Sequence, residues 1–106
     1  MPGELKEINK LKIDNLTLKK ASLVLRAINH KLRQQILRLL DDKQKMTVTE
    51  IFVYFRLEQS VISQHLTILR RAGFVTTERQ GKFIYYFVNY DRVNQMHKEL
   101  RDLLSY

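Results

Sequence analysis

A helix with two chemically different faces, followed at once by a glycine, constrains the fold of this chain most. Ile62, Leu66 and Leu69 recur at three- and four-residue spacing, so they lie on one side of a helix. Small polar side chains occupy the other side. Gly73 comes next, at the place where a left-handed residue commonly ends a helix. The sequence therefore predicts an amphipathic helix from about Gln59 to Ala72 with one buried face.

Two strand-like runs follow this helix and are separated by only two residues. Phe74–Arg79 and Lys82–Val88 flank Gln80-Gly81, and a two-residue connection that contains glycine suits a tight β-hairpin turn. Side chains in the second run alternate between two faces of the hairpin. We expect one of these two sets to face the core: Ile84, Tyr86 and Val88.

The chain before this region predicts further helices. Apolar residues from Leu16 to Ala27 recur at helical spacing, and Asn29 or His30 then offers a break and a cap. The next helix has one apolar face and one polar face. Its inward set is Leu32, Ile36, Leu39 and Leu40, and its outward set is Arg33, Gln34 and Arg38.

A capping box marks the start of the helix that precedes Gln59. Thr47 can accept a hydrogen bond from the backbone three residues later, while Glu50 reaches back to the backbone of Thr47. The connection Arg56-Leu57-Glu58 is short, so the two helices on either side of it must turn sharply against each other. Helix, tight turn and helix together form the helix-turn-helix arrangement.

The last helix is predicted over Asp91–Leu104, where apolar residues again form a stripe. The expected order is α-α-α-α-β-β-α, a mainly α fold with a small β-hairpin. A length of 106 residues corresponds to one folded domain. We expect this domain to cover residues 16–106, with residues 1–15 forming a polar arm or an extension of the first helix.

The charge balance favours an anionic partner. The chain has 19 Lys and Arg against 11 Asp and Glu, a formal net charge of +8, which suits a nucleic acid, an acidic protein or a membrane surface. The absence of cysteine excludes disulfides, thiolate metal sites and cysteine nucleophiles. No apolar run reaches the ~18 residues of a membrane span, and the N-terminus lacks the apolar core of a signal peptide. We therefore expect a cytoplasmic protein.

The polar face of the Gln59–Ala72 helix has the side chains that a DNA groove requires. A major groove admits one helix and presents donors and acceptors that Gln and Ser can bond. The plainer alternative is an ordinary solvated face. Beside a capped helix and a tight turn, we interpret this face as DNA-reading, and its candidate contacts are Gln59, Ser60, Ser63, Gln64 and Thr67.

The hairpin tip supplies candidate contacts to the DNA backbone. Arg79 and Lys82 flank Gly81 directly after the candidate reading helix, so we expect phosphate or minor-groove contacts there. Arg70 and Arg71 end the helix, where cations offset its dipole. The hairpin aromatics offer only a small platform for RNA stacking.

Catalytic and metal-binding constellations are missing. The sequence contains no paired carboxylates, Ser/His/Asp set or phosphate-binding glycine loop in a suitable context, so an enzyme is not expected. His30, His65 and His97 are scattered along the sequence. We expect His65 to pack against neighbouring residues or to contact phosphate. We expect no cofactor and no metal.

The chain from about Leu25 to Val88 resembles the ArsR/SmtB family of winged-helix regulators. The matching pieces are Ala27–Arg33, Ile36–Leu40, Gln59–Leu66, Leu69–Val75 and Arg79–Tyr86. The resemblance implies a bacterial, homodimeric repressor that binds double-stranded operator DNA through the helix-turn-helix and the wing. It also implies a dimer interface between the first and last helices, whose residues here are Leu16, Leu23, Val93, Met96, Leu100, Leu103 and Leu104.

The chain departs from this family where many members bind metals. Thr47-Val48-Thr49 stands in place of a Cys-x-Cys, and Asp91-Arg92-Val93 lacks the His of an Asp-x-His. His97-Lys98-Glu99 lacks its distant partner. The resemblance therefore leaves the effector unknown.

Two further positions differ from the family pattern. Glu58 stands where a capping Ser is common, and Lys31 where Pro is common. A carboxylate near phosphate lowers DNA affinity. The alternative to DNA binding is a winged-helix interaction module whose basic face binds an acidic protein.

Overall fold

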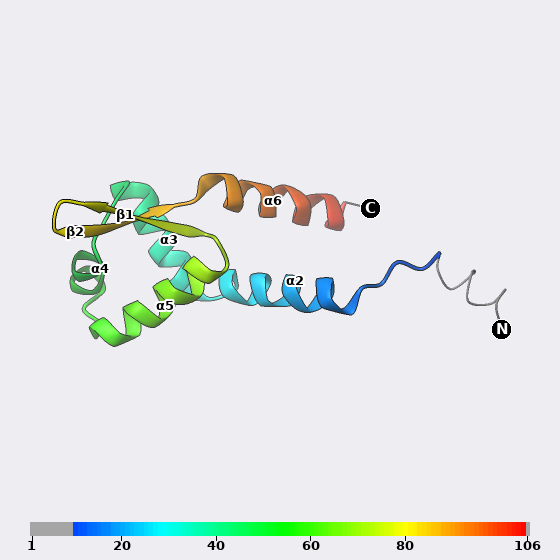
Figure 1. The fold of residues 1–106 in the computed structure, drawn as a ribbon, viewed down its shortest axis with the longest axis horizontal. Helices are drawn as coiled ribbons and strands as arrows, with labels where there is room; N and C mark the ends of the chain where they lie inside the picture. The colour runs from blue at the N-terminus through cyan, green and yellow to red at the C-terminus, as the bar shows by residue number, and fades with distance from the viewer. Residues whose placement is uncertain (1–9, 106) are drawn as a thin grey trace.

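Within residues 10–105, which the computed structural model describes, the chain forms five helices and one two-stranded hairpin (Figure 1). The elements are α2 (Asn15–Ile28), α3 (Lys31–Lys43), α4 (Val48–Phe55), α5 (Gln59–Arg71), β1 (Val75–Gln80), β2 (Phe83–Val88) and α6 (Tyr90–Leu104). This order confirms the predicted winged helix-turn-helix architecture.

The first described helix begins at a well-formed cap. The Asp14 carboxylate accepts hydrogen bonds from the Leu16 backbone N–H at 3.0 Å and from the Thr17 hydroxyl at 2.7 Å. Both bonds lower the pKa of Asp14 because they stabilise its charged form, and the Thr17 bond has the larger effect. Residues 10–14 lie outside the helix. The rest of the predicted N-terminal arm lies outside the described residues.

The break between α2 and α3 falls where the sequence predicted it. His30 begins α3, and its Nδ1 accepts a hydrogen bond from the Leu32 backbone N–H at 3.2 Å. Asn29 ends α2, and its backbone N–H donates to the Leu25 carbonyl. Of the two candidate caps, His30 is therefore the N-cap of α3.

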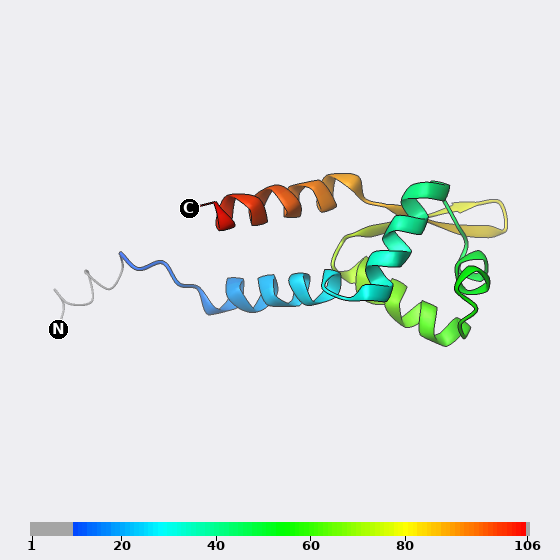
Figure 2. The same cartoon turned by 180° about the vertical axis from the view of Figure 1, so that it is seen from behind.

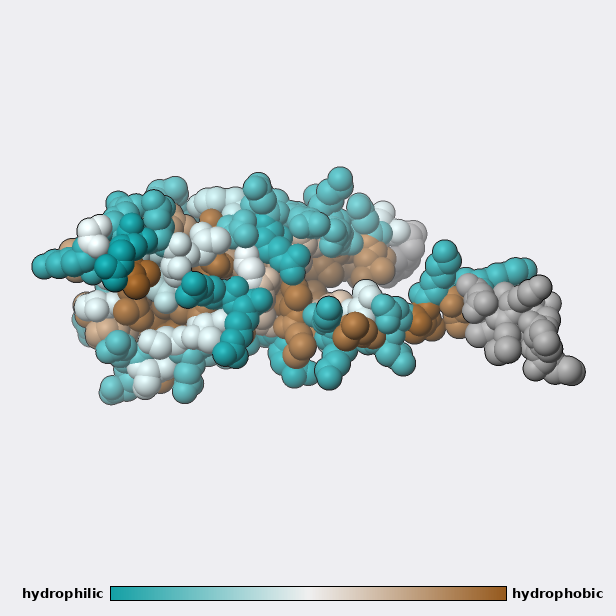
Figure 3. Space-filling model, viewed as in Figure 1, coloured by the Kyte–Doolittle hydropathy of each residue, from teal (hydrophilic) through white to brown (hydrophobic). Residues whose placement is uncertain are grey.

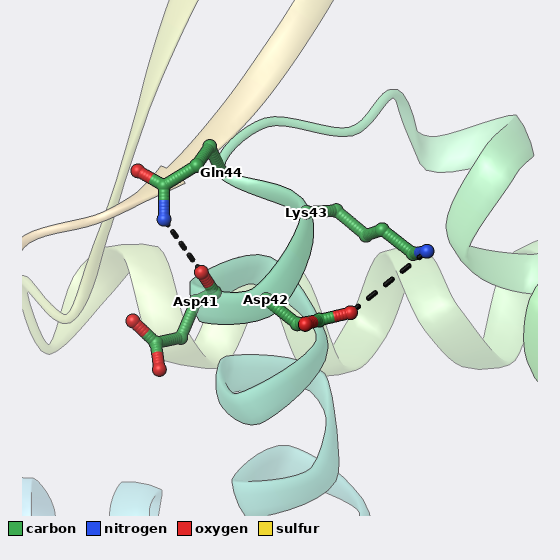
Figure 4. Close-up of polar contacts among 4 residues, drawn as sticks. All are labelled: Asp41, Asp42, Lys43 and Gln44. Carbon is green, nitrogen blue, oxygen red and sulfur yellow. Dashed lines mark hydrogen bonds and ion pairs between the residues drawn. The ribbon is translucent and has the colours of Figure 1, made fainter.

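The C-terminal end of α3 is closed by Gln44, which has a φ of 74°. Its backbone N–H donates to the Leu40 carbonyl at 2.8 Å, and its side-chain amide donates to the Asp41 carbonyl at 2.6 Å (Figure 4). Lys43 and Asp42 form an exposed ion pair at 3.8 Å, and such pairs contribute little stability. The left-handed backbone at Gln44 therefore ends the helix, and its side-chain amide satisfies one of the last carbonyls.

The predicted capping box at the start of α4 is confirmed. The Thr47 hydroxyl accepts from the Glu50 backbone N–H at 3.2 Å, and the Thr47 backbone N–H donates to the Glu50 carboxylate at 3.1 Å. Arg56 then adopts a left-handed conformation with a φ of 56°. The Leu57 backbone N–H donates to the Phe52 carbonyl at 3.1 Å. These contacts close the turn between α4 and α5.

The end of α5 depends on glycine. Gly73 has a φ of 85°, and its backbone N–H donates to the Arg70 carbonyl at 3.0 Å. The Phe74 backbone N–H donates to the Leu69 carbonyl at 2.9 Å. This pair of bonds is the Schellman motif. The predicted left-handed stop at Gly73 is confirmed.

The hairpin differs from the prediction at its turn. Gln80 pairs with Phe83, so Gly81 and Lys82 are the two central residues, rather than Gln80 and Gly81. A φ of 66° at Gly81 suits a turn with glycine in the first central position. The strand alternation is correct, but Ile84 is 48% exposed because the hairpin extends beyond the body that covers Tyr86 and Val88.

A third segment lies against β2. The Tyr86 backbone N–H donates to the Met46 carbonyl at 2.8 Å, and the Met46 N–H donates to the Tyr86 carbonyl at 3.3 Å. The connection between α3 and α4 therefore continues the sheet for one residue pair, which fixes the base of the wing to the helix-turn-helix.

One apolar core joins α3, α4, α5 and the hairpin. From behind, α3 crosses the base of the hairpin (Figure 2). The buried apolar residues are Ala27, Ile36, Leu39, Leu40, Met46, Ile51, Ile62, Leu66, Leu69, Phe74 and Val75. The residues predicted to hold α5 down are among them, so its inward face is confirmed.

The terminal helices extend away from this core. Helices α2 and α6 project from the same end of the body (Figure 1). Helix α6 has no buried residue, and α2 has only Ala27. No helix among the described residues is long and apolar enough to cross a membrane.

Candidate nucleic-acid interface

Helix α5 presents its polar residues on the side away from the core. Gln59, Ser60, Gln64 and Thr67 are exposed and Ser63 is half-buried, while the opposite apolar face is buried. The first turns of α5 lie at the same end of the molecule as α4 and the hairpin tip (Figure 1). The five candidate base-contacting residues therefore share one accessible surface.

Two of these residues are already bonded to each other. The Thr67 hydroxyl donates to the Ser63 backbone carbonyl at 2.9 Å. Its proton is committed to that bond, so the Thr67 oxygen remains available only as an acceptor. Gln64 and Gln59 both keep a free side-chain amide among the described contacts, so each can donate and accept hydrogen bonds on this face.

Arg71 belongs to the same surface, although the sequence predicted for it only the role of offsetting the helix dipole. With Ser63, Gln64, Thr67 and Ile68 it lines a shallow hollow of about 390 Å³. Arg71 is exposed and lies in the last turn of α5. Positions 64, 67 and 71 follow helical spacing, which is the signal that could have identified Arg71.

The start of α5 is weakly capped. Glu58 is the N-cap residue, but its side chain accepts no cap hydrogen bond. The first backbone N–H groups of a helix carry partial positive charge and suit an anion. The exposed Glu58 carboxylate places a negative charge at this positive end of the helix.

The hairpin tip exposes the three residues predicted for the wing. Arg79, Gly81 and Lys82 are all exposed. The Lys82 ammonium lies 5.3 Å from the centre of the Phe83 ring, and no atom lies within 4 Å of the place where a side chain on Gly81 would begin. The tip therefore combines two cations with an open backbone.

Lys45 is a further cation beside the wing that the sequence analysis missed. Its ammonium donates to the Gln80 side-chain oxygen at 2.6 Å and lies 4.6 Å from the centre of the Tyr85 ring. The pairing of Met46 with Tyr86 brings Lys45 there. In the sequence, Lys45 belongs only to a polar connection, so no local pattern identified it.

Arg33 and Gln34 do not lie outside α3 as the sequence predicted. Arg33 is only 7% exposed, and it donates to the Ala27 carbonyl at 2.6 Å and the Arg26 carbonyl at 3.0 Å. The Gln34 amide donates to the Ile28 carbonyl at 2.9 Å. Both side chains satisfy carbonyls at the end of α2 that have no partner within the helix. Arg38 is exposed, as predicted.

The terminal helices carry exposed apolar side chains (Figure 3). Among the predicted interface residues, Leu16, Leu23, Leu103 and Leu104 are exposed. Val93 and Met96 instead pack against the edge of the protomer's own core, and Leu100 is half-buried. Leu18 and Leu25, which the sequence analysis did not single out, are exposed on α2 as well.

Metal-ligating side chains do not gather in the described part of the chain. Among residues 10–105, no three His, Cys, Asp or Glu side chains lie close enough to hold a metal ion. Asp91 and His97 are both exposed on α6.

Known proteins are similar to this chain in sequence and fold. The profile of the family described as bacterial regulatory protein, ArsR family, matches residues 30–77. An HTH-type transcriptional regulator of Methanocaldococcus jannaschii, MJ1325, is 33% identical over 79% of this chain and 94% of its own length.

Two solved structures are similar as well. The transcriptional repressor PagR of Bacillus anthracis is 31% identical, with a TM-score of 0.65 over 82% of this chain and 99% of that chain. HlyU of Vibrio cholerae is 33% identical, with a TM-score of 0.64 over 85% of this chain and 97% of that chain. The family consists of DNA-binding regulators rather than enzymes. The chain thus belongs to the ArsR family of winged helix-turn-helix transcriptional regulators.

Proposed function

We propose that this protein binds operator DNA as a homodimer and represses transcription. One observation carries the proposal: the exposed polar face of α5 and the basic hairpin tip lie at one end of the molecule, while uncovered leucines lie on the helices at the other (Figures 1 and 3). A dimer formed through α2 and α6 leaves both reading surfaces free for DNA.

The N-terminal half of α5 enters the major groove in this proposal. Gln59, Ser60, Ser63 and Gln64 contact base edges, and Gln64 has the amide geometry that pairs with adenine. Thr67 acts as an acceptor or a packing contact because its proton is bonded to the Ser63 carbonyl.

The wing positions the protein on the DNA backbone. Arg79 and Lys82 contact phosphates, and the bare backbone at Gly81 allows the tip to approach the minor groove. Such contacts supply affinity and orientation rather than sequence preference. Their expected signature is an affinity that falls steeply as salt rises.

Dimerisation determines the form of the operator. The exposed leucines of α2 and α6, Leu16, Leu23, Leu103 and Leu104, would be covered by a second copy, with Val93, Met96 and Leu100 at the border between this interface and the core. A twofold dimer reads two half-sites related by symmetry. Their centres should lie about one helical turn apart, ~34–36 Å.

Repression is proposed as the regulatory direction. PagR is named a transcriptional repressor, whereas the related HlyU is named a transcriptional activator. A dimer of small domains that covers two adjacent half-sites obstructs a promoter directly. We infer that the protein works in the cytoplasm, where the chromosome is accessible, and we assign no metal or other effector.

Selection of bound duplexes from a randomised pool tests the DNA-reading proposal. The wild-type protein should enrich a palindromic sequence. Ser63→Ala combined with Gln64→Ala should lose about 1–3 kcal/mol of discrimination for each base contact removed. Gln35→Ala, on the exposed side of α3, is the matched control and should enrich the wild-type sequence.

Two results would count against this assignment. An unchanged sequence preference in the Ser63→Ala, Gln64→Ala variant would show that α5 does not read the bases. Failure of the wild type to bind any duplex at low salt would contradict DNA binding and favour an acidic protein as the partner.

A further inference from the structure

The buried guanidinium of Arg33 connects two helices that have different tasks. It donates to the carbonyls of Arg26 and Ala27 at the end of α2, at 3.0 and 2.6 Å. Its remaining contact is with Nδ1 of His65 on α5, at 3.2 Å. Arg33 therefore joins the end of the proposed dimerisation helix to the reading helix through one side chain.

The Arg33–His65 contact requires a neutral histidine. Arginine carries only donors, so His65 Nδ1 must supply the lone pair. Protonation at Nδ1 would place an N–H group against the guanidinium N–H groups and break the bond. A neutral His65 with its proton on Nε2 is the form that this geometry accepts.

The surroundings of His65 also oppose a positive charge. Among residues 10–105, the charged or titratable groups that face it are His30 and Arg33. The His30 ring lies 4.8 Å away, centre to centre, and its Nδ1 is occupied by the Leu32 backbone N–H. Burial, then His30 and Arg33, lower the pKa of His65 below its usual 6.5.

His65 points away from the surface that would contact DNA. Residues two apart on an α-helix are separated by about 200°, so His65 and Thr67 lie on nearly opposite sides of α5. The DNA that the reading face contacts in the proposed complex therefore lies on the far side of the helix from this histidine.

We propose that Arg33 and His65 form a proton-sensitive link that fixes the position of α5 relative to α2, so that protonation of His65 weakens DNA binding. Arg33 is a positioning residue in this scheme, because it acts through His65 and does not contact DNA. In the free protein, α5 can shift and relieve the repulsion of a protonated His65. In the complex the groove holds α5 in place, so DNA binding expels the proton.

The inference rests on the proposed function. Measuring DNA affinity at several pH values tests DNA binding and its dependence on His65 as two distinguishable results. The probe is a duplex that the wild-type protein has selected from a randomised pool, and the variant is His65→Asn, which keeps a side-chain acceptor but does not titrate. Between pH 7.5 and 5.5, wild type should lose affinity by about fivefold or more relative to His65→Asn. His97→Asn, on the exposed surface of α6, is the matched control and should follow the wild-type profile.

Parallel pH profiles of wild type and His65→Asn would overturn the inference while leaving DNA binding intact. Absence of wild-type binding at pH 7.5 would instead overturn the proposed function and the inference with it. Circular dichroism at each pH verifies that every protein compared is folded.

A titration of the His65 ring by NMR provides a second test that needs no substitution at position 65. The midpoint should be lower in the DNA complex than in the free protein. Arg33→Lys, which keeps the charge but loses the forked donor, should reduce this difference. Equal midpoints in the free and bound wild-type protein would contradict the link.

Discussion

Amphipathic helices lie at both ends of the molecule, but their apolar faces are covered at one end and exposed at the other. At the reading end, α5 buries Ile62, Leu66 and Leu69 within the protomer, and none of the three is more than 1% exposed. At the other end, α6 buries no residue, and Leu103 is 75% exposed. An apolar stripe therefore indicates that a helix needs a partner, but not whether that partner belongs to the same chain.

The largest expected effect comes from charging the uncovered end. Leu16→Asp combined with Leu103→Asp should leave the protomer folded, because both side chains are exposed. The proposed dimer should dissociate, and operator affinity should fall by about 100-fold or more, because two linked reading heads become independent. Light scattering measures the mass.

The control for this experiment places the same charges elsewhere on the same helices. Ser22→Asp combined with Asn94→Asp also changes exposed positions on α2 and α6, and it should keep the dimer mass. An unchanged mass in the leucine variant would remove α2 and α6 as the interface and abolish the contrast between the two ends.

Substitution of Gly73, between the two ends of the molecule, should have the next largest effect. Gly73 ends α5 with a φ of 85°, and a side chain there would begin 3.4 Å from Nε of Arg92 on α6. Gly73→Ala should destabilise the protein by about 1–2 kcal/mol, because L-residues are strained in this conformation. Urea unfolding measures the loss.

Gly81→Ala separates strain from contact in the Gly73 experiment. Gly81 also has a positive φ, of 66°, but nothing lies within 4 Å of its added side chain. Any excess loss at Gly73 measures the cost of displacing the Arg92 side chain, which is the nearest neighbour there. If Gly73→Ala unfolds at the wild-type urea concentration, the described end of α5 is wrong.

A smaller effect is expected from changing the N-terminal cap of α5, which differs from the cap of α6. The α6 cap is complete, since Asn89 accepts from the Arg92 backbone N–H at 3.3 Å, whereas Glu58 gives α5 no side-chain bond. Glu58→Ser should stabilise the protein by less than about 1 kcal/mol, because the lost attraction between the carboxylate and the helix dipole partly offsets the new cap bond. It should also raise DNA affinity, because a carboxylate leaves the anion-binding end.

Glu58→Gln is the companion variant, because it removes the charge without adding a short capping hydroxyl. It should raise DNA affinity with little gain in stability, as measured by binding titration and thermal unfolding. Weaker DNA binding by Glu58→Ser would indicate that the carboxylate faces a base or a cation rather than phosphate.

The smallest expected effect concerns single charges on the wing. Arg79→Ala and Lys82→Ala should each reduce the slope of log affinity against log salt by about 1. Arg101→Ala, on the exposed surface of α6, should leave the slope unchanged. Equal changes at all three positions would mean that net charge, and not the wing, governs the salt dependence.

Local sequence signals predicted the reading end well. The Thr47–Glu50 capping box, the α5 bounds and the left-handed Gly73 each depend on residues close together in the chain, and each is confirmed. The candidate DNA contacts share one exposed surface, but their roles remain predictions.

Features that depend on distant residues were not predicted. The burial of Arg33 requires the carbonyls of the preceding helix and a histidine 32 positions away. A charged side chain at an outward-looking position gives no sign of such partners. Similarly, the pairing of Met46 with Tyr86 and the resulting position of Lys45 depend on how the sheet is assembled.

The Met46–Tyr86 pair has a consequence for insertions and deletions. It couples the length of the connection between α3 and α4 to the position of the wing. One residue added before Met46 would shift the pairing along β2. Each step along a strand is about 3.3 Å and reverses which side chains face inward. An added residue that does not bulge out of this connection would therefore move the wing relative to α5 and the surface proposed to contact DNA.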